Sequence, residues 1–262
     1  MSMNRFNAIL ISIICSIWSM HAQELSISEV VRQRYTRELE QEHTSLIKTL
    51  LRIFNVDDQE WQERLIQVRR DYEQEDESCK ARYASRYGHI DPELEARFYM
   101  LLRAQGINDR DIVIANNGGF PEAGKRFVAC SKHFFDSLCL TVKEQDALLL
   151  HEIAHIIHDD LIVWNALYVL LEKASWYRKA VAFPIMLKWH RFSERRADLT
   201  ACLAGYPYAQ ILGEALRKLT PFSSKIQTSH PTFKSRARYI QAFCEHVVRA
   251  ANTDGAVSVI NA

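Results

Sequence analysis

The sequence lacks any strong excess of charge, because 33 Lys and Arg residues nearly balance 32 Asp and Glu residues and leave a formal net charge of +1. It therefore gives no electrostatic reason to expect nucleic acid or an acidic macromolecule as a partner. It also contains no internal repeat and no low-complexity run. With 262 residues, 48% hydrophobic and 25% charged, the chain fits one globular unit that can bury a sizeable core.

A Cys-x-x-Cys pair is also missing, so a zinc site built from cysteines is not expected. The six cysteines are Cys15, Cys79, Cys130, Cys139, Cys202 and Cys244. If the chain is exported and Cys15 is removed, the other five could form one or two disulfides, and at least one thiol would remain. Their pairing cannot be read from the sequence. Buried free cysteines that pack as small hydrophobic residues are an equal alternative.

The N-terminal apolar run, from Phe6 to Met20, is short for a membrane span, which needs about 20 residues. Arg5 precedes the run and the small residue Ala22 follows it. This pattern is typical of a signal peptide over residues 1–22, which would place the protein in the periplasm or elsewhere in the cell envelope. An uncleaved anchor is the second interpretation, because Met20 stands where a cleavage site prefers a small residue, and an apolar first helix is the third.

Residues 23–90 are predicted to form two charged helices. Apolar residues recur at helical spacing from Val30 to Phe54, "NVDDQEW" breaks the pattern, and a second helix runs from about Asp58 to Tyr87. We expect these helices to pack on the core, with partner binding as the alternative.

Residues 91–251 are predicted to form the main domain, followed by a loose tail over residues 252–262. Its first helix has Asp91 as cap and Pro92 in the first turn, and it stops at Gly106. "RDIVIANNGG" and "KRFVACS" then predict two short strands of a small sheet.

Two apolar blocks lie later in this domain, Leu161–Leu171 and Ala180–Leu187, and neither is long enough to span a bilayer. We expect both to be core helices, with membrane-surface contact as the main alternative.

The residues that could bind a metal ion or act in catalysis are concentrated in "LLLHEIAHIIHDD". Thr141 and Glu144 have the spacing of a capping box, which places this stretch inside a helix. His151 and His155 are four residues apart, so they share a helix face and can bind one metal ion. Glu152 lies close to that face without needing to be a ligand.

The His-Glu-x-x-His pattern suits metal-assisted hydrolysis. A bound ion would lower the pKa of a water molecule and polarise a carbonyl group, while Glu152 would act first as base and then as acid toward the leaving amine. A chain with ten histidines can also produce the pattern by chance. The uncharged Ile153 and Ala154 between the histidines fit a buried active-site helix.

A catalytic zinc ion needs a third protein ligand. The candidates are His158, His190, Glu194 and His230. His158 would crowd the ion against the helix axis, so Glu194 in "RFSERRADLTA" is the better choice. Asp198 lies four residues later and could accept the free ring N–H of a ligating histidine. The alternative for both acids is an exposed helix face that pairs with Arg195 and Arg196.

Three motifs, "ALLLHEIAH", "SERRAD" and "SHPTFKSR", follow the order and spacing of the HtpX and CAAX prenyl protease family of zinc metallopeptidases. The chain resembles this family over about residues 111–240. Family members are gluzincins, so the resemblance implies a mainly helical α+β zinc metallopeptidase domain with a small sheet beside the motif helix. It further implies one Zn²⁺ per chain, bound by His151, His155 and Glu194, with Asp198 supporting a ligand.

The last motif matches through His230, Pro231 and Arg236. His230 could stabilise the oxyanion or block the open zinc position, and a structural histidine at a helix start is the alternative. Arg236 could neutralise Glu194 or Asp198, although we favour a structural anchor. Four other residues are expected to have surface or packing roles: His133, His158, Asp159 and His190.

Two features depart from the family pattern. "ANNGGFPEAG" stands where members have a different substrate-pairing edge strand, and the long membrane spans are missing. The chain is therefore most similar to the soluble, exported bacterial members. The expected function is that of a zinc metalloendopeptidase in extracytoplasmic protein quality control, with extended protein or peptide substrates. An inactive zinc-binding chaperone or scaffold is the first alternative, and a helical structural protein with accidental motifs is the second.

Overall fold

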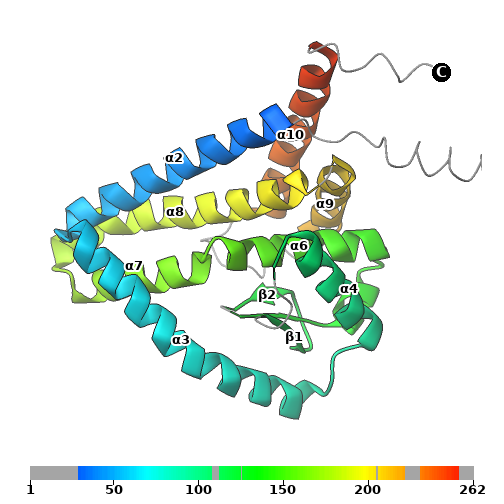
Figure 1. Ribbon diagram of the computed structural model, residues 1–262, viewed down its shortest axis with the longest axis horizontal. Coiled ribbons are helices and arrows are strands. Elements are labelled where there is room, and N and C mark those ends of the chain that lie inside the picture. Colours follow the sequence, from blue (N-terminus) through cyan, green and yellow to red (C-terminus); the bar gives the residue numbers. More distant parts are fainter. Residues whose placement is uncertain (1–28, 108–111, 125, 205, 222–230, 254–262) are drawn as a thin grey trace, which may run out of the picture.

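The computed structural model describes residues 29–107, 112–124, 126–204, 206–221 and 231–253 (Figure 1). These residues form long helices around one small three-stranded sheet, which confirms the mainly helical α+β class. The predicted signal segment over residues 1–22 and His230 lie outside the described residues, as does nearly all of the predicted tail.

The N-terminal helices form as predicted, with α2 over Glu29–Phe54 and α3 over Asp58–Tyr87. Between them, Asn55 adopts a positive φ of 58°, which reverses the chain. Most of the apolar residues at helical spacing on α2 are buried, among them Leu39, Leu46 and Leu50. Helix α2 packs along α8, and α3 packs against α7 and β1 (Figure 1). The expectation that the pair packs on the core is thus confirmed for α2.

Helix α4 (Pro92–Ala104) begins at the predicted cap. The Asp91 carboxylate accepts hydrogen bonds from the backbone N–H groups of Glu93 and Leu94, at 3.1 and 3.0 Å. After the helix, Gly106 has a φ of 72°, a conformation that favours glycine and ends the helix as the sequence predicted.

The sheet contains β1 (Val113–Asn116), β2 (Glu122–Ala123) and β3 (Phe127–Cys130) in the order β1-β3-β2. Strand β1 runs parallel to β3 and β2 runs antiparallel to it. The sequence predicted β1 and β3, while the two residues of β2 are too few to show an alternating pattern. All four residues of β3 are buried. Strand β2 lies at an edge and packs against α6.

The short helix α5 (Lys132–Ser137) leads to the motif helix α6 (Val142–Ile157), which starts with the predicted capping box. Thr141 Oγ1 accepts the Glu144 N–H at 3.3 Å, and Glu144 Oε2 accepts the Thr141 N–H at 2.7 Å. The same Glu144 oxygen also accepts a hydrogen bond from Lys218 Nζ at 2.8 Å. Every residue from Ala147 to Ala154 is buried, so α6 is the central helix of the fold.

Among the described residues, four helices follow α6 in sequence: α7 (Asp160–Lys173), α8 (Trp176–Leu203), α9 (Tyr206–Leu219) and α10 (Phe233–Thr253). Helix α8 packs against α6 as well as α2, and α9 packs against α10, α6 and α8. Among the described helices, none alone is long and apolar enough to cross a membrane. Helices α6 and α7 reach that length together but are bent by 52°.

The two predicted apolar blocks have different environments. The first block lies on α7, where Ile162, Ala166 and Leu167 are buried as expected. The second block lies on α8, where only the face carrying Ala182 and Met186 is buried, whereas Val181 and Phe183 are exposed. The prediction of a core helix was therefore wrong for the outward face of the second block, because only one side of α8 meets the protein there.

The four cysteines whose side chains are described are free. Cys130, Cys202 and Cys244 are buried, and Cys139 is exposed. The buried three fit the alternative of small hydrophobic packing residues. Cys15 lies outside the described residues, and the Cys79 side chain is likewise not described.

Thr141→Ala removes the capping hydroxyl of α6, and we expect it to lower the free energy of unfolding by about 1 kcal/mol. The measurement is urea denaturation followed by circular dichroism. Thr49→Ala is the matched control, because this hydroxyl only bonds back to the Ser45 carbonyl within α2. Equal stability of the two variants would contradict the structural importance of the cap.

Candidate metal centre

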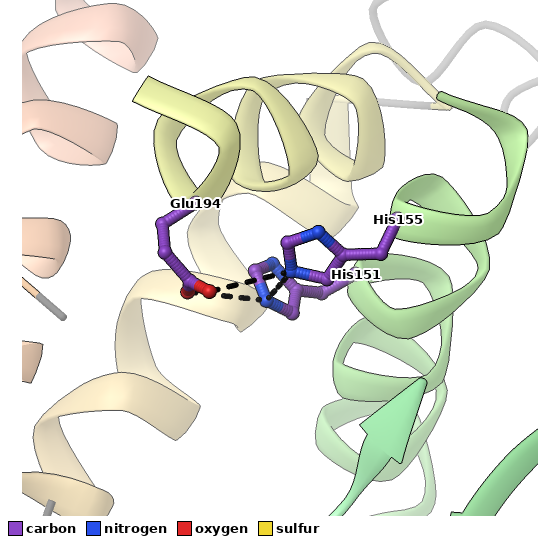
Figure 2. Close-up of side chains that lie close together, drawn as sticks. All are labelled: His151, His155 and Glu194. Carbon is purple, nitrogen blue, oxygen red and sulfur yellow. Dashed lines mark hydrogen bonds and ion pairs between the residues drawn. The ribbon is translucent and has the colours of Figure 1, made fainter. Parts of the chain in front are cut away.

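Three side chains from two helices point at one another: His151 and His155 from α6, and Glu194 from α8 (Figure 2). The two Nε2 atoms are 3.1 Å apart. Glu194 Oε2 lies 3.6 Å from His151 Nε2, and its Oε1 lies 3.5 Å from His155 Nε2. Zinc bonds of about 2.0–2.1 Å in a tetrahedron place ligand atoms about 3.3 Å apart. The spacing therefore fits a metal ion bound between the three groups.

Each histidine is held by its own buried aspartate. His151 Nδ1 lies 2.9 Å from Asp198 Oδ1, and His155 Nδ1 lies 2.8 Å from Asp160 Oδ2. A carboxylate accepts a hydrogen bond, so each Nδ1 can donate to its aspartate, and each Nε2 faces the centre, where the neutral ring has a lone pair for a metal ion. Such aspartates fix the ring orientation and increase the basicity of the ligating nitrogen.

The centre favours positive charge. Burial alone would lower the pKa of His155, but its hydrogen bonds to Asp160 and Glu194 outweigh that effect and raise the pKa well above the ordinary value. The negative groups that attract a proton to this position also attract a metal cation. The two Nε2 atoms, 3.1 Å apart, are close enough to share one cation. The donor set and its field therefore suit a divalent cation.

Asp160 is a site residue that the sequence reasoning missed. On a continuous helix it would lie about 140° around the axis from His155 and could not reach its ring. Asp159, however, has a positive φ of 53°, and the chain turns there so that α7 starts at Asp160. The buried Asp160 also accepts a hydrogen bond from Arg196. An acid directly after the end of a motif helix was the only available signal.

Asp198 is fully buried and lies in an ion-pair network with Arg236. Arg236 Nε and Nη2 donate to the two carboxylate oxygens of Asp198 at 2.8 and 2.6 Å, and Tyr239 adds a hydrogen bond. Burial would raise the pKa of Asp198, but the charge of Arg236 and the contact with His151 outweigh burial and lower the pKa to about 2. Asp198 is thus held as a carboxylate beside its histidine.

Arg236 reaches from α10 to both acids of α8, because its Nη1 also lies 3.0 Å from Glu194 Oε2. Burial would lower its pKa, yet Asp198 and Glu194 raise it, so the guanidinium stays charged. These contacts agree with the neutralising role that the sequence left open. The same contacts tie α10 to α8, so the anchoring role that we favoured also stays a prediction.

Glu152 is buried, and its carboxyl group interacts electrostatically with all three candidate ligands. Burial raises the pKa of its carboxyl group, and Glu194 adds to the increase, whereas His151 and His155 oppose it. A carboxylate with a raised pKa is a stronger proton acceptor. The position therefore suits a general base, as the motif predicts.

The residues that we expected to be uninvolved lie away from the three ligand groups. His158 Nε2 lies 2.8 Å from Thr200 Oγ1, His190 packs edge-on against Trp164, and Asp159 pairs with Arg69. His133 is exposed.

The exposed-face alternative for Glu194 and Asp198 was wrong, since both acids are buried. Arg195 pairs with Glu42 and Arg196 with Asp160 instead.

Comparison of the chain with protein-family models, with curated proteins and with solved structures found no match. The family resemblance therefore depends on the three sequence motifs alone. The buried group of His151, His155 and Glu194 is defined by its geometry, whether or not the family resemblance holds.

Asp160→Asn should weaken metal affinity by about tenfold or more, because the variant carries a neutral amide where a carboxylate now orients His155. The measurement is competition for zinc with a chromophoric chelator. Asp159→Asn is the control, since this neighbouring acid is exposed and paired with Arg69. If both variants bind zinc equally well, Asp160 does not support the site.

Arg236→Met leaves two buried carboxylates without their cation, so we expect the free energy of unfolding to fall by about 3 kcal/mol in the presence of a chelator. Arg238→Met on the exposed side of α10 should change stability by less than about 0.5 kcal/mol. Chemical denaturation compares the two. A loss of similar size in both variants would show that the network does not stabilise the fold.

Proposed function

We propose that the protein is a zinc-dependent metalloendopeptidase of the gluzincin type, related to the HtpX and CAAX prenyl protease family. The single observation that carries this proposal is the buried group of His151, His155 and Glu194 with Glu152 beside it. Two oriented imidazoles and one carboxylate match the ligand set of catalytic zinc sites, which keep a fourth position open. When bound, zinc would polarise a carbonyl group and lower the pKa of a water molecule.

Residues of the chain transfer the proton, orient the two histidines and offset the negative charge of the site. Glu152 accepts the proton of the attacking water and passes it to the nitrogen of the leaving amine. Asp198 and Asp160 keep His151 and His155 in the tautomer that presents Nε2 to the centre. Arg236 offsets the negative charge of Glu194 and Asp198, so that their repulsion does not open the site.

The substrate is an internal peptide bond of a protein in extended conformation. Strand β2 lies at the edge of the sheet and packs against α6, the helix that carries His151 and Glu152. A peptide can add to such an edge through backbone hydrogen bonds. The signal-like segment over residues 1–22 supports export, and we propose a role in protein quality control in the cell envelope.

The test combines zinc content with cleavage of an unfolded protein such as casein. Wild-type protein should contain one zinc per chain and cleave casein. Glu152→Gln should keep zinc and lose activity by about 10²-fold or more. Glu194→Ala should lose zinc, whereas the control Glu214→Gln, at an exposed position on α9, should retain zinc and activity.

Each other outcome has a definite meaning. Activity that survives in Glu152→Gln would contradict the mechanism. Stoichiometric zinc without cleavage in the wild type would favour a zinc-binding chaperone or scaffold. If the purified protein is folded but contains no metal, the proposed function is wrong.

A further inference from the structure

The end of the molecule where α7 meets α8 exposes several large apolar side chains. On α8, Trp176 is 81% exposed, Val181 55%, Tyr177 53% and Phe183 52%, and on α7 Tyr168 is 46% exposed. These five residues are called the α7–α8 apolar face below. Figure 1 shows this turn at the opposite end of the molecule from α9 and α10. Among them, the rings of Trp176 and Tyr177 are in contact, with centroids 6.4 Å apart. Exposed apolar groups that gather near one place mark interaction sites more often than isolated ones do.

The α8 residues of this face lie at helical spacing on a helix that is packed against the rest of the protein. Trp176, Ala180 and Phe183 follow one another at spacings of four and three residues, so they form one stripe along α8. The opposite side of the same turns is buried through Ala182 and Met186. The first turn is also tied down, because Arg178 Nη1 donates to the Phe54 carbonyl oxygen at 3.0 Å. The apolar stripe is therefore presented outward by a fixed helix.

The α8 part of this face carries charges of one sign, whereas Glu172 near the end of α7 adds one exposed acid. From Trp176 to Ser193, α8 contains no Asp or Glu. The basic residues in this part of α8 are Arg178, Lys179, Lys188 and Arg191. Three of them are exposed, and Lys173 at the end of α7 is exposed too. The chain as a whole is close to neutral, so this is a local accumulation of positive charge.

Aromatic side chains combined with lysine and arginine match the chemistry of an anionic phospholipid surface. Trp and Tyr favour the boundary between headgroups and acyl chains, and Phe and Val favour the acyl side of it. Lys and Arg extend their stems along the apolar layer and place their charges at the phosphates. None of the described helices spans a membrane alone, so the contact would be with the surface.

We propose that the α7–α8 apolar face docks the protein onto the surface of an anionic phospholipid bilayer. The first turns of α8 lie in the headgroup region, with Trp176 and Phe183 inserted and Lys179 and Lys188 at the phosphates. Glu194 lies on the same helix, 18 residues after Trp176, a separation of about 27 Å along a helix. Docking would therefore keep the candidate metal centre within about 27 Å of the docked turn. The proposal stands independently of the proteolytic function.

The test measures binding of the full chain to sedimenting vesicles of phosphatidylcholine, with or without phosphatidylglycerol. Wild-type protein should bind the anionic vesicles and bind the neutral vesicles more weakly. The double variant Trp176→Ser with Phe183→Ser should bind anionic vesicles about tenfold more weakly. The matched control, Ile66→Ser with Met100→Ser, removes two apolar residues that are 46% and 57% exposed elsewhere and should bind as wild type does.

The charge contribution has its own pair of variants. Lys179→Glu with Lys188→Glu should weaken binding to anionic vesicles about tenfold. Lys48→Glu with Lys234→Glu makes the same change at exposed lysines of α2 and α10 and should have little effect. Equal binding of both pairs, or equal binding of neutral and anionic vesicles, would overturn the assignment of an anionic surface.

A second readout separates this face from the apolar run Phe6–Met20, which could bind lipid by itself. Brominated lipids quench tryptophan fluorescence at short range, so part of the quenching in wild type should disappear in Trp176→Phe. Unchanged quenching in that variant, with unchanged binding of the Trp176→Ser, Phe183→Ser protein, would contradict docking through α8. A shift of that double variant to a smaller particle in solution would also contradict it, and would assign the face to contact with a second copy.

Discussion

The structure depends on two imidazole rings whose Nε2 atoms lie 3.1 Å apart inside the protein. Buried aspartates hold the opposite nitrogen of each ring, so both lone pairs face the same point. Glu194 on α8 places a carboxylate at the same point, so the cluster could hold a cation. The cluster joins α6 to α8, and Arg236 connects α10 to it.

Local sequence signals predicted the parts of the fold that depend on neighbouring residues. The Thr141–Glu144 capping box, the Asp91 cap and the break before Asp58 are each set by a few adjacent side chains. Strand β2 was missed because its pairing with β3 depends on tertiary contact and involves two residues. The outward face of α8 was also misjudged, since hydrophobicity alone does not say which side of a helix the rest of the chain covers.

In the candidate site, too, local patterns were predicted and features that depend on tertiary structure were missed. The i, i+4 spacing was enough to predict that His151 and His155 share one face. The order of the motifs was enough to predict that Glu194 lies beside them. The role of Asp160 could not be predicted from the sequence, because it depends on the positive φ of Asp159, where the chain turns between helices. No pattern in the sequence predicts a turn of this kind next to a histidine ligand. His230 lies outside the described residues, so its role stays a prediction.

Helix α8 connects the two surfaces of functional interest. Its second half buries Glu194 and Asp198 in the cluster, and its first half presents aromatic and basic side chains outward. One helix would therefore set both the geometry of the candidate metal centre and, if the proposed docking holds, its position relative to a bilayer.

X-ray absorption spectroscopy at the zinc edge of the purified protein tests the central claim most directly. We predict a first shell of nitrogen and oxygen atoms only, at about 2.0–2.1 Å, with scattering from two imidazole rings. A shell that contains sulfur at about 2.3 Å, or a spectrum without bound imidazole, would show that the metal is held elsewhere and would contradict the site.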